Sequence, residues 1–184
     1  DGEEIGHGGM GEVVEAFDVD LRRSVARKRI RGTGKGAVPD ASTLGRFIEE
    51  AQVTAQLSHP GIVPVHALGR TRDGLPLIVM KRIDGVSLGD LLDAADHPLR
   101  ELLPGGNADP LRGYLWVLSQ VCNAVHFAHS RGIVHRDIKP DNIMVGSFGE
   151  VYLLDWGIAV QADPEGAPPP AARDLAGTPA YMAP

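Results

Sequence analysis

The order of apolar and polar residues predicts a first part of the chain made of short strands and one helix. Residues 5–14, "IGHGGMGEVV", are rich in glycine and then turn apolar, and residues 24–30, "SVARKRI", alternate between two faces as a short strand does. Residues 44–58 carry apolar side chains at helical spacing until "HPGIV" ends the helix. The apolar runs 62–69 and 75–83 flank the turn "RTRDG", so we expect two more strands there.

The second part of the chain is predicted to be mostly helical. A polar stretch with Gly and Pro, 84–110, precedes a strong helix over about 111–130, and short strands are expected at 142–146 and 151–156. One apolar stripe of the helix is expected to lie in the core, with Cys122 as a buried, inert thiol. The stripe consists of Leu111, Tyr114, Leu115, Leu118, Val121, Cys122, Val125 and Ala128.

This order of elements predicts the fold class. Strands with one helix, followed mostly by helix, are typical of an α+β protein with two lobes, which we expect at residues 1–83 and 84–184. A chain of 184 residues is long enough for one core or for two small lobes. Because the chain starts at Asp1 and stops at Pro184, we expect it to be a piece of a longer protein.

Charge and cysteine content narrow the class of protein and its partners. The chain has 18 basic and 24 acidic residues, a net charge of −6, which argues against nucleic acid as a partner. The single cysteine excludes an internal disulfide and fits a reducing compartment, so a cytoplasmic location is expected for this domain; a membrane anchor elsewhere in the full-length protein stays open. No apolar run approaches the ~20 residues that span a bilayer.

The glycines at the start of the chain are a weak signal when taken alone. Gly6, Gly8 and Gly11 form the pattern G-x-G-x-x-G, but glycine clusters mark turns more often than nucleotide sites. A dinucleotide-binding fold would need a helix directly after the glycines and an acid ~20 residues further on. Here the sequel is strand-like and then basic, which excludes that fold.

A second stretch, "VHRDIKPDNIM" at residues 134–144, places charged residues and an amide between apolar neighbours. Such charges are costly to bury unless they are paired or bind a metal. With the glycines, "VARK", "EEA", "DWG" and "GTPAYMAP", this stretch makes the chain resemble the Hanks-type (eukaryotic-like) serine/threonine protein kinases, especially bacterial ones. The resemblance implies a protein-kinase-like two-lobed fold, truncated in the second lobe because the chain stops at "MAP".

The resemblance also implies a role for each charged residue of that stretch. Asp137 would be the catalytic base toward a substrate hydroxyl, and Lys139 would neutralise the transferring phosphoryl group. Asn142 and Asp155 would hold Mg²⁺, with Mn²⁺ as a possible substitute. Phosphoryl transfer depends on placed cations and an in-line nucleophile, so a charged loop beside a strand is chemically reasonable.

The nucleotide is expected to be bound mainly by the first lobe. Lys28 would contact the α- and β-phosphates and be held by Glu50 or its rival Glu49. The two glutamates lie about 100° apart around the helix, so only one can face the cleft, and the family's "EA" pattern favours Glu50. Met80 matches the gatekeeper position, and Met144 comes from the second lobe. The full set that the resemblance implies for ATP is Ile5, Gly6, Gly8, Gly11, Val13, Ala26, Lys28, Met80, Lys81, Ile83 and Met144.

Several positions depart from the family's pattern. Arg27 stands where an aliphatic residue is usual; because Ala26 and Lys28 share one face of a strand, Arg27 is expected to point away from the nucleotide, onto a wet or acid-paired side. Lys81 and Arg82 replace the usual acid and aromatic residue after the gatekeeper. Trp156 replaces a Phe and is expected to be buried with its N–H bonded.

The activation segment lacks the usual site for a regulatory phosphate. Residues 156–177 contain no Ser, Thr or Tyr, although Arg136 belongs to the arginine pattern that is often paired with such a phosphate. The first hydroxyl is Thr178, which the resemblance makes structural. We therefore hypothesise that a carboxylate, foremost Asp174, replaces the phosphate in part, with constitutive activity or control by kinase–kinase dimerisation.

Two alternatives to a protein serine/threonine kinase stay open from the residues. A pseudokinase or ATP-binding scaffold is disfavoured because Lys28, Asp137, Asn142 and Asp155 are all present. A small-molecule phosphotransferase shares part of the charged loop, but the glycines, Lys139 and "GTPAYMAP" favour protein substrates with Ser or Thr.

Overall fold

A computed structural model describes residues 2–8, 11–30, 39–161 and 176–182. The chain divides into two compact units. The first unit comprises Asp1–Gln56 and Val63–Ile83, and the second unit comprises Leu57–Ile62 and Asp84–Pro184. Within the described residues, no helix combines the length and the apolar character that crossing a membrane requires.

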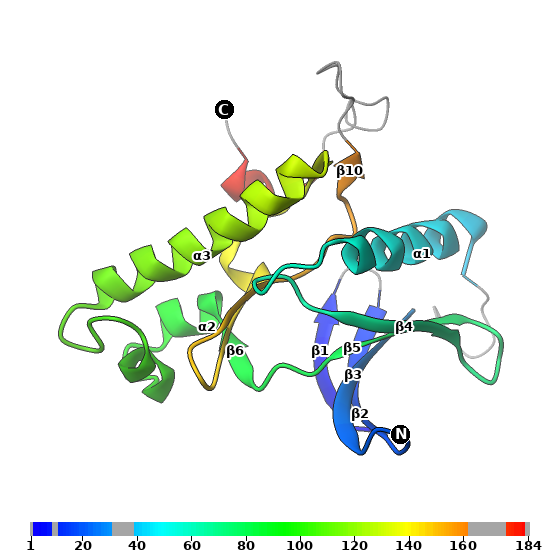
Figure 1. Cartoon of the computed structure of the whole chain (residues 1–184), viewed down its shortest axis with the longest axis horizontal. Coiled ribbons are helices and arrows are strands. Elements are labelled where there is room, and N and C mark those ends of the chain that lie inside the picture. The colour runs from blue at the N-terminus through cyan, green and yellow to red at the C-terminus, as the bar shows by residue number, and fades with distance from the viewer. Residues whose placement is uncertain (1, 9–10, 31–38, 162–175, 183–184) are drawn as a thin grey trace. The chain divides into compact units, whose positions relative to one another are not determined.

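The first unit is a five-stranded antiparallel sheet with one helix (Figure 1). The strand order is β1-β2-β3-β5-β4. The three-stranded meander β1–β2–β3 and the hairpin β4–β5 therefore meet where β3 pairs with β5. Gly11 allows the close approach of β2 to β3, because a Cβ there would lie 2.2 Å from the carbonyl oxygen of Arg29. The strands are β1 (Glu4–Gly8), β2 (Gly11–Asp18), β3 (Arg23–Ile30), β4 (Val65–Arg70) and β5 (Pro76–Lys81).

The helix α1 (Ala41–Gln56) packs on one face of this sheet (Figure 1). It begins three residues before the predicted start, because the carboxylate of Asp40 accepts hydrogen bonds from the backbone N–H (2.9 Å) and the hydroxyl (2.7 Å) of Thr43. Its apolar side packs against residues of β3 and β5. The buried cluster consists of Phe47, Ala51, Ile30 and Ile78, with Leu44, Val65 and Met80 around it.

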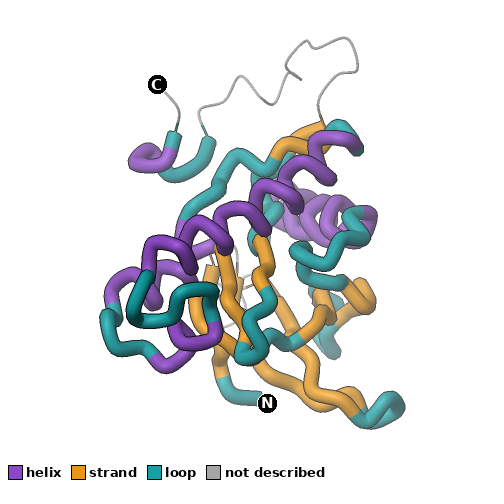
Figure 2. The backbone as a smooth tube through the Cα atoms, turned by 60° about the vertical axis from the view of Figure 1, so that its left-hand side comes forward, coloured by secondary structure: helices purple, strands orange, loops and turns teal. Residues whose placement is uncertain are grey.

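The second unit is organised around a long helix, α3 (Pro110–Ser130), which contacts β7 and β9 (Figure 2). Asp109 caps its first turn by accepting from the N–H of Arg112, and Pro110 occupies the first helical position, where no N–H is needed. Small strands form the sheets β6-β8-β9 and β10-β7. Their bounds are β6 (Gly85–Ser87), β7 (Ile133–Val134), β8 (Ile143–Gly146), β9 (Val151–Leu153) and β10 (Val160–Gln161).

The predicted core stripe of α3 is wrong for half of its members, whereas Val121 and Ala128 are buried as predicted. Leu111, Leu115 and Leu118 are more than half exposed, and Cys122 is an exposed thiol rather than a buried one. The buried side of α3 consists of Gly113, Val117, Val121, Ala124 and Ala128.

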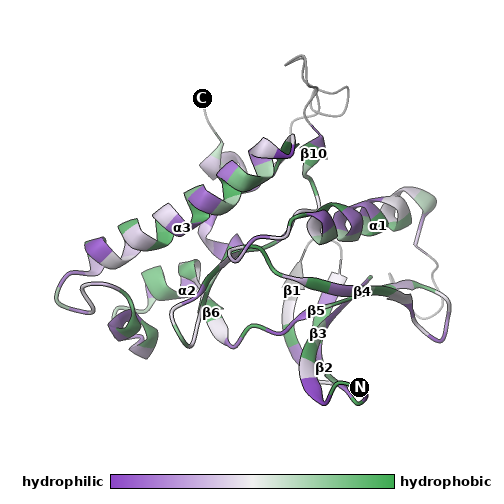
Figure 3. Ribbon diagram, viewed as in Figure 1, coloured by the Kyte–Doolittle hydropathy of each residue, from purple (hydrophilic) through white to green (hydrophobic). Residues whose placement is uncertain are grey.

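The buried side of α3 consists of small side chains and two valines, and at one of these positions the approach is very close. A Cβ on Gly113 would lie 3.0 Å from the Cβ of Leu103, so at this position the helix lies closer to Leu103 than a larger side chain would allow. Figure 3 shows hydrophobic and hydrophilic residues mixed along α3.

The polar stretch 84–110 also holds more structure than predicted. It contains the short helix α2 (Leu88–Asp93) and the 3-10 helix η1 (Pro98–Leu102). In α2 the Ser87 hydroxyl accepts from the Asp90 N–H, and the Asp90 carboxylate accepts from Ser87, a capping box that the sequence carries as S-x-x-D.

Candidate active site

The charged loop of the second unit lies between β7 and the 3-10 helix η2 (Pro140–Asn142), and His135 holds it in place. The imidazole is 1% exposed, its Nε2 lies 2.8 Å from the carbonyl oxygen of Leu154, and its Nδ1 accepts from the N–H of Asp137 at 3.1 Å. The ring meets the edge of Trp156 at a centroid distance of 4.6 Å. Burial lowers the pKa of His135, so the imidazole is neutral and donates through Nε2.

The carboxylate of Asp137 is surrounded by hydrogen-bond donors. Its Oδ1 accepts from the backbone N–H of Thr178 (2.9 Å) and from the Thr178 hydroxyl (2.7 Å). Its Oδ2 accepts from Asn142 Nδ2 (3.0 Å) and lies 2.9 Å from Lys139 Nζ. Burial acts to raise the pKa of Asp137, but the bonds from Thr178, Lys139 and Asn142 outweigh it and lower the pKa below its ordinary value. This carboxylate is therefore a fixed, ionised acceptor.

Lys139 and Thr178 complete a small polar network around that carboxylate. Lys139 Nζ donates to the Thr178 hydroxyl at 2.8 Å, and its hydrogen bond to Asp137 raises the pKa of Lys139, so the ammonium stays charged. Thr178 is placed by Gly177, whose φ of +120° and close approach to the Arg136 carbonyl oxygen leave no room for a Cβ. The sequence predicts a structural role for Thr178 but not the role of Gly177 in placing it. The dipeptide "GT" is the sequence signal for that role.

Asn142 and Asp155 come from neighbouring segments of the second unit. Asn142 is 8% exposed, and its Nδ2 donates to both the carbonyl oxygen and the carboxylate of Asp137. The backbone of Asn142 is tied to the segment before Asp155, because its carbonyl oxygen accepts from the Leu154 N–H at 2.8 Å. Asp155 has a φ of 59°, a backbone conformation that is uncommon for a residue other than glycine.

These two side chains fit a hard divalent cation. The amide nitrogen of Asn142 is committed to Asp137, which leaves its side-chain oxygen as the atom that a metal would use. Among the described residues, no three His, Cys, Asp or Glu side chains form a metal cluster. One carboxylate and one amide oxygen match Mg²⁺, which keeps water and phosphate oxygens among its ligands, better than they match a metal held by the protein alone.

In the first unit, Lys28 and Glu50 form a buried ion pair between β3 and α1. Lys28 Nζ donates to Glu50 Oε1, and the two side chains are only 9% and 8% exposed. The structure thus pairs Glu50, and not Glu49, with the lysine, because Glu50 lies on the side of α1 that is buried with Phe47 and Ala51. Buried charges of this kind are retained when they are paired.

The other residues expected at the nucleotide are placed as follows. The strand register puts Val13, Ala26, Lys28 and Met80 on one face of the first unit's sheet. Ile5 and Gly6 lie on β1, Gly8 ends β1 and Gly11 begins β2. Lys81 ends β5, Ile83 ends the first unit, and Met144 lies on β8 of the second unit.

The departures from the family's pattern have distinct outcomes. Arg27 lies on the opposite face of β3 from Lys28, as predicted, but its Nε is buried and has no hydrogen-bond partner among the described residues, so this atom is neither wet nor acid-paired as expected. Trp156 is 2% exposed and its Nε1 donates to the Leu153 carbonyl oxygen at 3.4 Å, also as predicted. Arg136 has a φ of 68° and donates from Nε to the Ile158 carbonyl oxygen at 2.8 Å. Asp174, the residue hypothesised to replace a phosphate, lies outside the described residues.

Comparison with known proteins identifies the family. The model of the protein kinase domain matches residues 1–184. The chain is 40% identical to serine/threonine-protein kinase PknD of Chlamydia trachomatis serovar D over 158 residues, which cover 85% of this chain and 16% of that protein. It is 38% identical to PknD of Chlamydia abortus, over 98% of this chain and 20% of that protein. PknD of Chlamydia caviae is 41% identical, over 88% of this chain and 17% of that protein.

These matches confirm the predicted α+β, protein-kinase-like fold and the predicted family, while the chain spans only about a fifth or less of the length of these relatives. The chain therefore belongs to the protein kinase domain family.

Proposed function

We propose that this domain transfers the γ-phosphate of ATP to serine or threonine hydroxyls of proteins. The observation that carries the proposal is the contact of the Thr178 hydroxyl with both Asp137 Oδ1 and Lys139 Nζ. A threonine hydroxyl therefore already fits between the carboxylate and the ammonium that the reaction needs. A substrate hydroxyl in an equivalent place would be aligned by Asp137, while Lys139 would offset charge on the transferring group.

In the proposed reaction, the substrate oxygen forms a bond to the γ-phosphorus as the bond to the ADP leaving group breaks. Asp137 orients the hydroxyl and takes up its proton as the new bond forms. The lowered pKa makes this carboxylate a weak base, so its contribution is mainly one of alignment, with proton transfer late in the step. Asn142 keeps the carboxylate in place through the two hydrogen bonds from its Nδ2.

The remaining site residues are proposed to serve the nucleotide. Lys28, held by Glu50, would bind the α- and β-phosphates, and Asn142 and Asp155 would hold Mg²⁺ or Mn²⁺. When bound, the metal neutralises phosphate charge during transfer. Support for this assignment comes from the buried ion pair and from the match of one carboxylate and one amide oxygen to Mg²⁺. Val13, Ala26 and Met144 would pack against the adenine.

The setting of the reaction is likewise part of the proposal. A cytoplasmic location is supported by the single, unbridged cysteine, and a partner other than nucleic acid is supported by the net charge of −6. Dimerisation of two kinase domains is the proposed alternative to control by a phosphate, because residues 156–177 offer no hydroxyl.

The test is transfer of labelled γ-phosphate to a generic protein substrate by the full-length protein. Lys28→Met and Asp155→Asn are expected to abolish transfer, whereas Arg22→Gln, a charge change in the exposed turn between β2 and β3, should leave it intact. An aminoglycoside offered as acceptor separates a small-molecule phosphotransferase from a protein kinase. Undiminished turnover by either site variant, or ATP binding without transfer to any protein, would refute the proposal.

A further inference from the structure

A cavity of about 530 Å³ opens in the first unit, among residues of the sheet and of the β4–β5 turn. It involves the face of β3 that carries Arg27 and Arg29, opposite to the face that carries Lys28, because alternate residues of a strand point to opposite sides. Its volume far exceeds the ~30 Å³ share of one water molecule, so an anion of several heavy atoms has room. The lining residues are Val14, Arg27, Arg29, Arg70, Thr71, Arg72, Asp73 and Leu77.

The charge of this lining is strongly positive in a chain that is acidic overall. The eight lining residues include four arginines and one aspartate, a net charge of +3, and counting Glu12 against Arg29 still leaves +2. The whole chain has a net charge of −6. All four cations are arginines, whose planar guanidinium groups form paired hydrogen bonds to phosphate.

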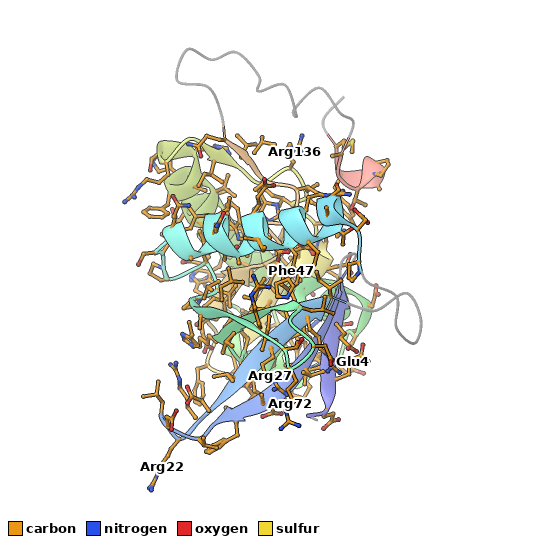
Figure 4. All side chains as sticks on the ribbon, turned by 90° about the vertical axis from the view of Figure 1, so that its right-hand side faces the viewer. Glu4, Arg22, Arg27, Phe47, Arg72 and Arg136 are labelled. Carbon is orange, nitrogen blue, oxygen red and sulfur yellow. The ribbon has the colours of Figure 1, made fainter. Side chains whose placement is uncertain are left out.

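The four arginines are held to different degrees by the protein itself. Arg29 Nε pairs with Glu12 Oε1 at 2.6 Å, and Arg70 donates to the Gly74 carbonyl oxygen at 2.8 Å. The Nε of Arg27 is buried and has no hydrogen-bond partner in the described part of the chain. Figure 4 shows Arg27 and Arg72 beside each other, and both line the cavity. A buried guanidinium N–H without a partner is costly, and a bound anion would remove that cost.

We propose that this cavity binds a phosphate-bearing ligand, with Arg27 and Arg72 as the main contacts and Arg29 and Arg70 at its sides. The phosphate is either a free di- or polyphosphate anion or a phosphoryl group carried by a protein side chain. This site does not depend on the proposed kinase reaction, since none of its residues belongs to the set assigned to ATP or to transfer. The domain would then have a second phosphate-binding site, separate from the proposed ATP site.

The experiment is a calorimetric titration of the full-length protein in magnesium-free buffer with inorganic pyrophosphate, and in a second arm with a phosphoserine peptide and its unphosphorylated form. Arg27→Gln and Arg72→Gln are each expected to weaken binding about tenfold or more, as loss of a hydrogen bond to a charged group does. Arg22→Gln is the matched control, because Figure 4 places Arg22 away from both residues. In NMR, the Nε–Hε signal of Arg27 should shift during the titration.

The two arms distinguish the source of the phosphate. Binding of pyrophosphate alone supports a free anion, and binding of the phosphopeptide, but not its unphosphorylated form, supports a protein-borne phosphate. Binding should also weaken with added salt, since partly exposed charges are screened. Absence of binding in both arms, an unmoved Arg27 signal, or equal affinity of the Arg27→Gln and Arg22→Gln variants would overturn the proposal. None of these results depends on whether γ-phosphate transfer is observed.

Discussion

The Lys28–Glu50 pair gives the sharpest test of how the first unit combines stability with function. Lys28→Met leaves the Glu50 carboxylate in a site where only 8% of its side chain is exposed, without the ammonium that offsets its burial. Removing one partner of a buried ion pair costs about 3–5 kcal/mol, because the other charge is then uncompensated. Glu50→Met should cost a similar amount, since the Lys28 side chain is 9% exposed.

The double variant Lys28→Met/Glu50→Met should recover most of the stability lost by either single variant. Two methionines bury apolar surface against the cluster of Phe47, Ala51 and Ile78, and apolar replacement of a buried pair is often neutral or stabilising by about 1–4 kcal/mol. Phosphate transfer should stay absent in all three variants. Stability and activity would then be separated at the same two positions.

Urea unfolding of the four proteins measures the three stability changes, and the kinase assay measures transfer. Arg82→Met is the matched control, because its pair with Glu15 spans 3.0 Å with both side chains 32% exposed, and partly exposed pairs contribute about 1 kcal/mol or less. The reasoning is wrong if Lys28→Met is as stable as the unmodified protein. It is also wrong if the double variant is less stable than both single variants.

Three further predictions concern the second unit and its control. Thr178→Val removes the hydroxyl that contacts Asp137 and Lys139, so the rate of transfer should fall by about 10–100-fold, as expected for loss of a hydrogen bond to a charged group. Thr178→Ser should keep most of the rate. Equal rates for the Thr178→Val variant and the unmodified protein would contradict this. Burial lowers the pKa of His135 below 6.5, so the unfolded state takes up a proton more readily than the folded state. The free energy of unfolding should therefore be constant in this respect above pH 6.5 and fall below it, by up to about 1.4 kcal/mol per pH unit. Urea midpoints measured across pH should lose this slope in His135→Gln but keep it in His129→Gln. Exhaustive phosphatase treatment with site mapping should leave transfer unchanged, because residues 156–177 have no hydroxyl. Loss of transfer together with a lost phosphate at Thr178 or Tyr181 would refute this.

Much of the candidate site could be predicted from the sequence because its chemistry depends on residue type and spacing. The strand period places Ala26 and Lys28 together and Arg27 opposite, and the observed register agrees. The helical period also limited the partner of Lys28 to one of two adjacent glutamates, and the structure pairs it with Glu50. Local patterns of this kind need no knowledge of distant parts of the chain.

The tertiary structure decided what depends on packing between distant segments. The sequence alone suggested that the leucines of α3 are core, but its buried side consists of Gly113, Val117, Val121, Ala124 and Ala128, and at Gly113 the helix lies close to Leu103. The bonds from Thr178 to Asp137 join residues 41 positions apart, and the bond from the Thr178 side chain is the largest of the contacts that lower the pKa of this carboxylate. The arginine-lined cavity likewise joins two hairpins, whose charges do not form one group in the sequence. Contacts of this range are set by how the elements pack, and a periodic pattern carries no record of them.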